Sequence, residues 1–314
     1  MTAPRRIWPY HAQMWLSRGL IATSFPVGEA ITRGLDPVTL TLVRFALASL
    51  LFAPFIALRY GIRLPPWRAL AGYAVISLCL VTFFWGMFAA LRTTTALNTS
   101  AIFTLVPGLA AIYAWTLLRE RLGIYRLGAL AIGLVGALWI VFRGDLDLAL
   151  SLAFNRGDLL FAAACLVMAL YMPLIKKFHR GEPIAVMTFW ILVTGTLWLV
   201  LFNNTKILTT DWAAVDINVF VGIAYLALVT TIFSFFLQQN AIVVLGPTRV
   251  AGSNYLNPAL VIVIEWIAGH GIPALIVLPG VAIVVAAMAV LQRGAKVEET
   301  PEAFDRDTPA AGPA

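Results

Sequence analysis

Four ionisable residues interrupt long apolar stretches of the sequence: Arg18, Glu29, Arg44 and Glu265. A charged side chain inside a lipid bilayer is costly, so each of them is a functional candidate by default. Arg44 lies seven residues into the apolar stretch that starts at Pro37. Its guanidinium offers a planar fork of donors that fits a carboxylate. Arg44 is therefore a candidate clamp for a substrate carboxylate, and the alternative is a structural ion pair with Glu29 or Glu265, or contacts with backbone carbonyls.

Uncharged polar residues gather in two of the apolar stretches, each time ahead of a proline. Asn98 precedes Pro107, whereas Asn254 and Asn257 precede Pro258. A proline inside a helix frees a carbonyl one turn back and kinks the helix, so both prolines are expected to offer acceptors to a cavity. The three asparagines are candidates for the wall of such a cavity. Hydrogen bonding between helices is the equally open alternative.

Aromatic residues supply the remaining cavity candidates, which are Trp85, Tyr171 and Trp190. Aromatic walls suit apolar and aromatic groups and can also hold cations. Core packing or lipid contact is the alternative for each of them. The three histidines lie at the ends of apolar stretches or in loops without metal-ligand spacing, and no nucleophile elbow, phosphate loop or catalytic carboxylate pair occurs. We therefore expect no metal, no cofactor and no enzymatic activity.

The composition indicates what kind of scaffold must position these residues. Of 314 residues, 61% are hydrophobic and 12% are charged, whereas a soluble domain carries roughly 25% charged residues. The chain is therefore expected to be an integral membrane protein. The net charge of +7 falls in short clusters between apolar runs, which argues against a nucleic-acid partner. Cys79 and Cys165 lie inside apolar runs and are expected to be buried thiols.

Ten apolar stretches are long enough to cross a bilayer, which takes about 20 residues per helix. The predicted spans are 11–32, 37–58, 69–91, 94–118, 123–142, 158–175, 183–202, 217–240, 247–269 and 272–291. With the N-terminus in the cytoplasm, 15 of the 22 Lys and Arg residues fall on the cytoplasmic side and 5 on the outer side. The positive-inside rule then predicts that both termini are cytoplasmic.

The second half of the chain repeats the first at an offset of 151 residues. Pro107 aligns with Pro258 and Trp115 with Trp266 without a gap. Five spans per copy require the second copy to enter the bilayer inverted, an arrangement typical of secondary transporters, whose substrate site lies where the copies meet. The predicted units are a first repeat at 1–142, an outer linker at 143–157, a second repeat at 158–292 and a disordered tail at 293–314.

The positions of the acidic residues bear on how such a transporter would be driven. Glu29 and Glu265 both lie near the outer ends of their spans, and no Asp or Glu lies near the middle of any span. Glu29 could pair with Arg33 one turn later, and Glu265 could be solvated at the membrane rim. Proton coupling through either carboxylate is the functional alternative. Arg18, assigned near the cytoplasmic end of the first span, is expected to snorkel to the interface.

Several of these residues resemble a known family. The stretch 96–120, with its small polar start, Pro107 and the final Arg119-Glu120, resembles the fourth helix of the EamA-like drug/metabolite transporters. Arg44 stands at the place of that family's second-helix arginine. The glycine run at 128, 133 and 136 resembles its fifth helix. Neither Glu120 nor Arg44 is duplicated in the second half, where Gly271 and Trp190 stand instead.

The resemblance implies an all-α integral membrane fold of ten transmembrane helices, as two inverted five-helix repeats around a central cavity. Helices 5 and 10 would be peripheral. Within the family the chain most resembles the bacterial aromatic amino acid exporters of the YddG group. This implies inner-membrane export of amino acids, aromatic and apolar ones included. The positions of the acidic residues favour a facilitative or weakly proton-coupled mechanism, and coupling to a sodium ion bound by carbonyls is the alternative. We expect a monomer or weak dimer. The alternative is efflux of cationic drugs such as quaternary ammonium compounds.

Overall fold

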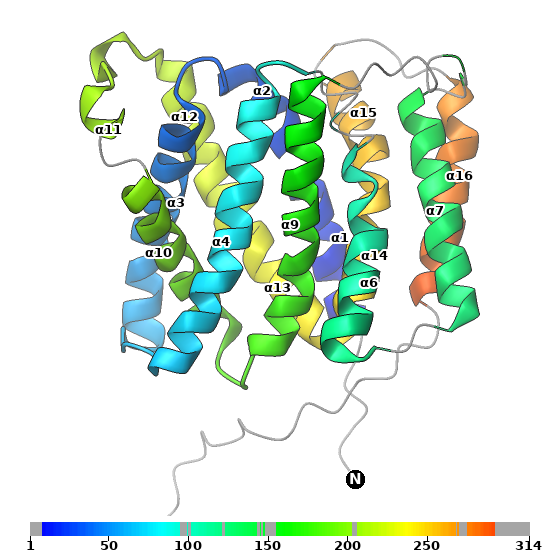
Figure 1. Cartoon of the computed structure of the whole chain (residues 1–314), viewed down its shortest axis with the longest axis horizontal. Coiled ribbons are helices and arrows are strands. Elements are labelled where there is room, and N and C mark those ends of the chain that lie inside the picture. The colour runs from blue at the N-terminus through cyan, green and yellow to red at the C-terminus, as the bar shows by residue number, and fades with distance from the viewer. Residues whose placement is uncertain are drawn as a thin grey trace, which may run out of the picture.

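The structure is a computed structural model of the chain. It describes residues 8–94, 99, 102–120, 123–142, 145, 147, 155–202, 206–267, 269 and 275–292. Asn98, most of the linker 143–157 and the tail 293–314 lie outside the described residues. The described part of the chain is helical throughout, without strands, and most of its helices run along one common direction (Figure 1).

Within the described residues, seven helices are long and apolar enough to cross a membrane. They are α3 (Pro37–Arg59), α4 (Trp67–Ala90), α7 (Ile124–Phe142), α9 (Arg156–Phe178), α10 (Ile184–Phe202), the continuous stretch Ile217–Leu245, and Leu275–Gln292, which comprises η4 (Leu275–Val277) and α16 (Leu278–Gln292). These bounds agree closely with seven of the predicted spans and support a multi-pass membrane protein. The total of ten spans stays a prediction, because the other three segments are interrupted.

The first predicted span divides into α1 (Trp8–Ala22) and α2 (Ser24–Ile31). Pro26 accounts for the break, because its nitrogen cannot donate to the carbonyl of Ala22 and its ring crowds that carbonyl. The ninth span divides into α14 (Pro247–Gly252), a 3-10 turn η3 (Ser253–Leu256) and α15 (Asn257–Ile267). Interrupted helices are common at the substrate sites of secondary transporters.

The fourth span is described from residue 102 onward, and its regular part is α6 (Val106–Leu118). A turn at 104–105 lies directly before it. This turn lies just ahead of Pro107. The 3-10 turn η3 occupies the matching place in the second half, just ahead of Pro258. Both prolines are buried. The expected disturbance of the helix at each proline is therefore observed, as a turn in the first half and a 3-10 turn in the second.

The stretch Ile217–Leu245 contains a π-helical segment that the sequence analysis did not predict. It consists of α12 (Ile217–Ala227), the π segment η2 (Leu228–Phe233) and α13 (Ser234–Leu245). The hydroxyls of Thr230 and Thr231 both donate to the carbonyl of Leu226, at 3.0 and 2.8 Å. Such π segments within α-helices often mark functional sites. The short helix α11 (Lys206–Thr209) and the short turn η1 (Trp212–Ala214) precede α12.

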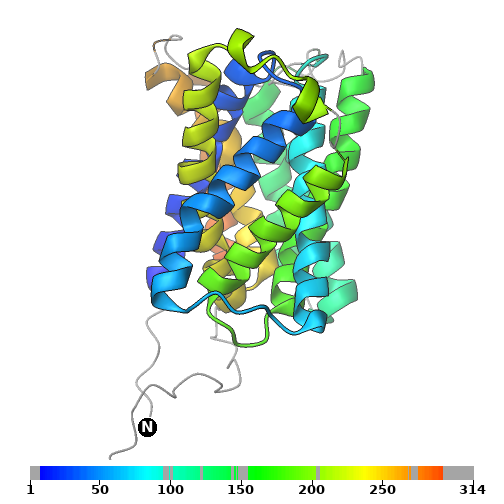
Figure 2. The ribbon, with the colours of Figure 1, turned by 90° about the vertical axis from the view of Figure 1, so that its left-hand side faces the viewer.

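The helices pack in pairs that relate the two halves. Helix α4 packs against α9, α1 against α13, α3 against α10 and α7 against α16. In the other half, α13 is the counterpart of α4 and α1 is the counterpart of α9, so the pairs α4–α9 and α1–α13 are equivalent. In the pairs α3–α10 and α7–α16, each helix packs against its own counterpart. Figure 2 shows α3 and α10 running side by side across one face. A two-fold axis between inverted repeats would produce this pattern of pairs.

Helices α7 and α16 form one edge of the bundle (Figure 1). They meet where Gly136 faces Gly280, and a Cβ atom on Gly280 would lie 2.8 Å from the carbonyl oxygen of Gly136. Gly133 likewise faces the ring of Tyr255, which its Cβ would approach to 2.7 Å. Small residues allow helix backbones to approach closely in a membrane. Two of the three glycines in the run of the fifth span, Gly133 and Gly136, thus lie at close contacts with the second half of the chain.

Candidate functional site

A small cavity lies in the middle of the bundle, between the two halves of the chain. Its lining comes from α1, α2, α3, α4, α9, η2, α13 and η3, together with Phe103. The cavity volume is about 20 Å³, which is room for about one water molecule. The described conformation is therefore closed around the site, and a molecule the size of an amino acid enters only when helices move apart.

Arg44 of α3 is completely buried at this cavity. Its Nε atom donates to the hydroxyl of Thr231 at 2.8 Å, and its Nη2 atom donates to the hydroxyl of Thr230 at 2.9 Å. Its guanidinium carbon lies 4.1 Å from the centre of the Phe84 ring, a cation–π contact. The predicted ion pair with Glu29 is wrong, because Glu29 is exposed on α2 and threonine hydroxyls hold the guanidinium instead.

Arg18 of α1 is the second buried guanidinium of the cavity, with 1% of its surface exposed. Its Nη1 atom donates a short hydrogen bond to the Oδ1 atom of Asn254 in η3. The expectation that Arg18 snorkels to the interface is therefore wrong. The side chain of Arg18 instead turns into the central cavity, where Asn254 of the other half binds it.

Several polar atoms at the cavity have no hydrogen-bond partner within the described protein. They include Nε and Nη2 of Arg18, Nη1 of Arg44, Nδ2 of Asn254 and Oε1 of Gln238. All four side chains line the cavity. A buried polar group without a partner is unfavourable, and groups of this kind at a cavity are suited to bind a ligand. Four of the five atoms are donors, so the site is suited to an electron-rich group such as a carboxylate.

The cavity is also positively charged. No Asp or Glu whose side chain the structure describes lines it, and neither Arg18 nor Arg44 forms an ion pair with a described carboxylate. The Glu265 side chain lies outside the described residues, so the predicted pair with Arg44 is not tested. Charges attract and repel more strongly in a low-dielectric interior than in water. Two guanidiniums with no described carboxylate in the cavity lining therefore favour an anionic ligand at the cavity.

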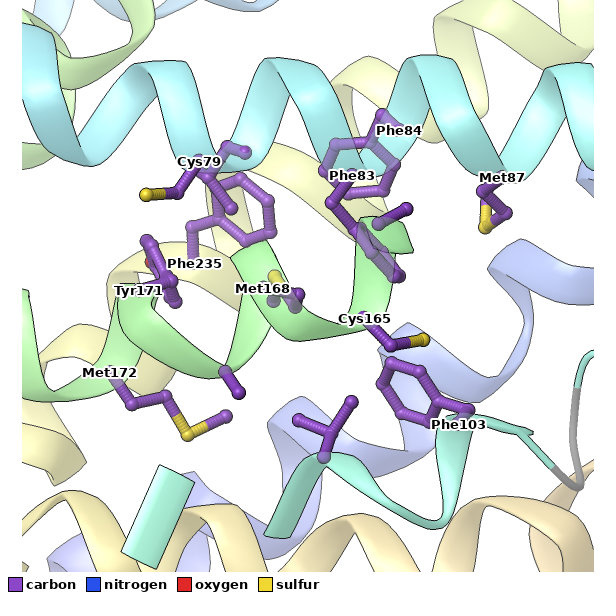
Figure 3. Close-up of a cluster of buried hydrophobic side chains, with 14 of the residues drawn as sticks. Cys79, Phe83, Phe84, Met87, Phe103, Cys165, Met168, Tyr171, Met172 and Phe235 are labelled. Carbon is purple, nitrogen blue, oxygen red and sulfur yellow. The ribbon is translucent and has the colours of Figure 1, made fainter. Parts of the chain in front are cut away.

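The remaining wall of the cavity is apolar and rich in Phe and Met. Figure 3 shows Phe83, Phe84 and Met87 of α4 facing Met168 of α9, with Phe103 beyond them. The ring of Phe84 also stacks on that of Phe235 of α13, with 6.0 Å between centroids. Aromatic rings and flexible thioethers fit apolar groups of varied shape. The buried thiols of Cys79 and Cys165 belong to the same cluster, as expected.

Two of the predicted aromatic candidates lie away from the cavity, and one lies next to it. Trp85 is 37% exposed, and Trp190 is half-buried against Phe189. Tyr171 is fully buried, 6.2 Å from the ring of Phe235 between centroids, and its hydroxyl accepts a hydrogen bond of 3.1 Å from Gln239. Neighbouring helix positions point in different directions, which explains why α4 presents Phe83 and Phe84 to the cavity but not Trp85.

The other predicted residues are placed as follows. Asn254 lines the cavity, whereas Asn257 is buried one turn later with both amide atoms lacking a partner. Glu29 and Arg33 are both exposed, and no ion pair joins them, so the predicted pair at the rim is wrong. Exposed charges gain little from pairing. Thr230 is a cavity residue that the sequence analysis missed, because a π segment leaves no clear sequence signal.

The comparisons with known proteins now identify the fold. The model of the EamA-like transporter family matches residues 15–142 and 155–292. The chain belongs to the EamA-like transporter family. The two matches fall on the two halves of the chain, and every residue that lines the central cavity lies within them.

The similar proteins are named as transporters. The chain is 23% identical to the uncharacterized transporter YyaM of Bacillus subtilis over 244 residues, which cover 77% of the chain and 80% of YyaM. It is 25% identical to the uncharacterized transporter YdfC of the same organism, covering 83% of the chain and 84% of YdfC. An uncharacterized transporter of Archaeoglobus fulgidus is also 25% identical over 82% of the chain and 88% of its own length.

A solved crystal structure has the same fold. It superposes with a TM-score of 0.71 over 90% of this chain and 96% of its own, at 17% sequence identity. The EamA-like chain is thus a membrane transporter, and its central cavity, where the halves meet, is the place at which transporters with repeated halves bind their substrates.

Proposed function

We propose that this EamA-like protein exports amino acids, apolar and aromatic ones among them, across the bacterial inner membrane. Both termini are cytoplasmic in this proposal, and the protein acts as a monomer or weak dimer. The observation that carries it is the pair of buried guanidiniums, Arg18 and Arg44, whose free N–H groups face one cavity with apolar walls. The resemblance of the sequence to aromatic amino acid exporters of the YddG group supports the finer assignment.

The chemistry of the cavity supports binding of a carboxylate with an apolar side chain. Arg18 and Arg44 offer the charged donors, and Nδ2 of Asn254 offers a neutral one. The rings of Phe83 and Phe84 form an apolar surface beside them. Charge-assisted hydrogen bonds to a carboxylate are roughly twice as strong as neutral ones, so the carboxylate fixes the orientation of the substrate. The apolar wall then accommodates side chains of different shapes.

Alternating access requires the halves to move relative to each other, and the site lies on the boundary that would open. Arg44 in the first half is bound to Thr230 and Thr231 in the second, and Arg18 is bound to Asn254. A carboxylate that takes over some of these donors would loosen the contacts between the halves. In this proposal substrate binding itself favours the change of conformation, since a ligand shifts the equilibrium towards the state that it binds better.

The transport is facilitative or weakly proton-coupled in this proposal. Glu29, one of the two carboxylates considered for coupling, is exposed and does not line the cavity. A proton carrier in an antiporter must be reachable from the substrate site, because protons and substrate compete there. Glu265 remains the second candidate.

Efflux of cationic drugs is the rival function, and the aromatic wall is the observation that favours it, since aromatic rings bind quaternary ammonium groups. The two guanidiniums argue against it, because a cation would enter a cavity that already holds two positive charges.

The decisive experiment measures counterflow of labelled amino acids into liposomes that contain the purified protein. We expect saturable exchange of apolar and aromatic amino acids, and at least a tenfold slower exchange in Arg44→Gln, because about 1.5–3 kcal/mol is typical of a hydrogen bond to a charged group. Arg59→Gln is the matched control, since Arg59 is an exposed arginine at the end of the same helix.

Equal rates in Arg44→Gln and the wild type, at equal thermal stability, would contradict the clamp. Transport of quaternary ammonium compounds without any amino acid exchange would favour the rival function.

A further inference from the structure

The charges and donors of the central cavity are unbalanced. Two guanidiniums line it, and three of their N–H-bearing nitrogens lack a partner: Nε and Nη2 of Arg18 and Nη1 of Arg44. Among the described cavity residues no carboxylate offsets them. The described lining therefore provides the donors that one carboxylate needs. One of its two positive charges stays without a negative partner after that carboxylate has bound.

The acceptors of the cavity are few and uncharged. The hydroxyl of Thr230 already accepts from Arg44 and donates to Leu226, and Oδ1 of Asn254 already accepts from Arg18. The hydroxyl of Ser24 donates to the carbonyl of Ile21 at 2.6 Å, and its oxygen can still accept a hydrogen bond. The Oε1 atom of Gln238 is the one buried side-chain oxygen of the lining without a partner.

A free amino group would be poorly accommodated in this surrounding. A protonated amine brings three donors and a positive charge. It would meet two available neutral oxygens, those of Gln238 and Ser24, and two guanidiniums that repel it, in an interior where charges interact strongly. Leaving donors of a charged group unpaired in a buried site is unfavourable. The site therefore accommodates the carboxylate of an amino acid better than its ammonium group.

We infer that the cavity selects apolar carboxylates of net negative charge, in which the amino group is absent or blocked by acylation, over zwitterionic amino acids. The chemical classes are 2-oxo acids and N-acyl amino acids with apolar or aromatic side chains. This inference rests on the proposed function, since it assigns the substrate class of the same arginine site.

The inference has a consequence for the energy source of export. An anion that crosses without a compensating ion moves one negative charge, and a cell interior that is negative drives it outward. The potential changes the equilibrium ratio of a monovalent anion about fifty-fold per 100 mV. Export of anions therefore needs no proton-carrying carboxylate in the cavity, in agreement with the described lining.

The test compares molecules that share one ring and differ in charge. Liposomes with the purified protein are assayed with phenylalanine, N-acetylphenylalanine, phenylpyruvate and phenylalaninamide, with and without a potassium diffusion potential set by valinomycin. We expect both anions to enter at least tenfold faster than phenylalanine, and entry of the anions to rise when the interior is positive. Phenylalaninamide is expected not to enter.

The outcomes separate this inference from the proposed function. Entry of phenylalanine at the rate of the anions, or faster, would overturn the inference and leave amino acid export standing. Failure of phenylalanine to enter at all would overturn the proposed function itself, and failure of the two anions as well would also overturn the inference. If the rate of anion entry does not change with the imposed potential, the anion does not cross as an uncompensated charge. That result would contradict the selection of substrates with a net negative charge.

Variants at Arg18 identify the group responsible. Arg18→Gln removes one of the two charges but keeps a donor for Asn254, so the preference for N-acetylphenylalanine over phenylalanine is expected to fall at least fivefold. Arg18→Lys keeps the charge and is expected to retain most of the preference, and Arg59→Gln is the exposed control. An unchanged preference in a well-folded Arg18→Gln protein would overturn the assignment. If that variant does not fold, the melting temperature of the wild-type protein is measured with each ligand. A larger rise with phenylalanine than with N-acetylphenylalanine would equally overturn the assignment.

Discussion

Arg44 of α3 donates a hydrogen bond of 2.8 Å to the hydroxyl of Thr231, a residue of the other half of the chain. The Thr231 hydroxyl in turn donates to the carbonyl of Leu226, five residues earlier. Threonine hydroxyls in α-helices usually donate three or four residues back, and the wider π-helical turn explains the longer reach. Thr230 donates to the same carbonyl. The π segment thus brings two adjacent hydroxyls onto one guanidinium.

Removal of either hydroxyl should destabilise the closed conformation. In Thr231→Val a buried N–H of the Arg44 guanidinium loses its acceptor, which typically costs about 1.5–3 kcal/mol for a charged donor. We expect a lower melting temperature in detergent and a similar loss for Thr230→Val. The control is Thr231→Ser, which keeps the hydroxyl and should remain close to the wild type. A Thr231→Val protein as stable as Thr231→Ser would show that the hydroxyl contributes no stability.

The contact between α7 and α16 gives a second prediction. Gly280→Ala would place a methyl group 2.8 Å from the backbone carbonyl of Gly136, and overpacking of this kind typically costs about 1–3 kcal/mol. Gly128→Ala on the same glycine run meets nothing within 4 Å and should be neutral or slightly stabilising, because alanine favours the helix. Thermal unfolding of the two variants checks the contrast, and equal melting temperatures would contradict the close approach.

Both Gly280→Ala and Gly128→Ala should leave the transport rate of the folded protein unchanged, since neither glycine lines the cavity. This expectation separates the α7–α16 pair, which supports the bundle, from the helices that form the site. Counterflow in liposomes, corrected for the amount of folded protein, provides the measurement.

The sequence predicted most of the long helices and the disturbances ahead of Pro107 and Pro258, but not the break at Thr23 or the π segment. The spans 37–58, 123–142 and 183–202 agree with α3, α7 and α10 to within one or two residues, because hydrophobicity and length determine a spanning helix. The break at Thr23 had a local signal in Pro26, three residues on. The π segment had none, since its register depends on contacts with a helix from the other half.

The candidate site was predicted in part. Arg44 was found because a charge deep in an apolar stretch is conspicuous. Arg18 was visible in the same way, but its role was misjudged because the buried partner that draws it into the cavity belongs to the other half of the chain. The partner of Arg18 is Asn254, which lies 236 positions further along the chain. Patterns in a single sequence do not reveal such pairs. Which aromatic residue of a cluster faces the cavity likewise depends on helix rotation, which packing sets.

Asp36, the N-cap residue of α3, gives a prediction about pH. Burial alone would raise the pKa of its carboxyl, but hydrogen bonds from Lys206 and from the backbone N–H of Val38 outweigh burial, and the pKa lies below its ordinary value. A lowered pKa in the folded state means that the ionised carboxylate stabilises the fold at neutral pH, and that this stability is lost as the pH falls through the folded-state pKa.

We expect Asp36→Ala to lose about 1 kcal/mol at pH 7, mostly through the lost N-cap of α3. Asp36→Asn should lose much less, because its amide oxygen can still cap the helix and the exposed pair with Lys206 contributes little. The difference in melting temperature between the wild type and Asp36→Ala should shrink as the pH falls from about 5 to about 3. A difference that grows on acidification would contradict the direction of the pKa shift.

The last prediction concerns the two carboxylates that could couple transport to protons. Glu29 is exposed on α2 and does not line the cavity, and substitutions at such surface positions usually change free energies by no more than about 0.5 kcal/mol. Glu29→Gln should therefore leave the counterflow rate within about twofold of the wild type between pH 6 and pH 8, measured in the same liposomes. Glu265→Gln is the informative counterpart, because α15 continues from the interrupted segment that carries Asn254. A pH dependence that vanishes in Glu265→Gln alone would assign coupling to that carboxylate, whereas its loss in Glu29→Gln would contradict the placement of Glu29 outside the transport path.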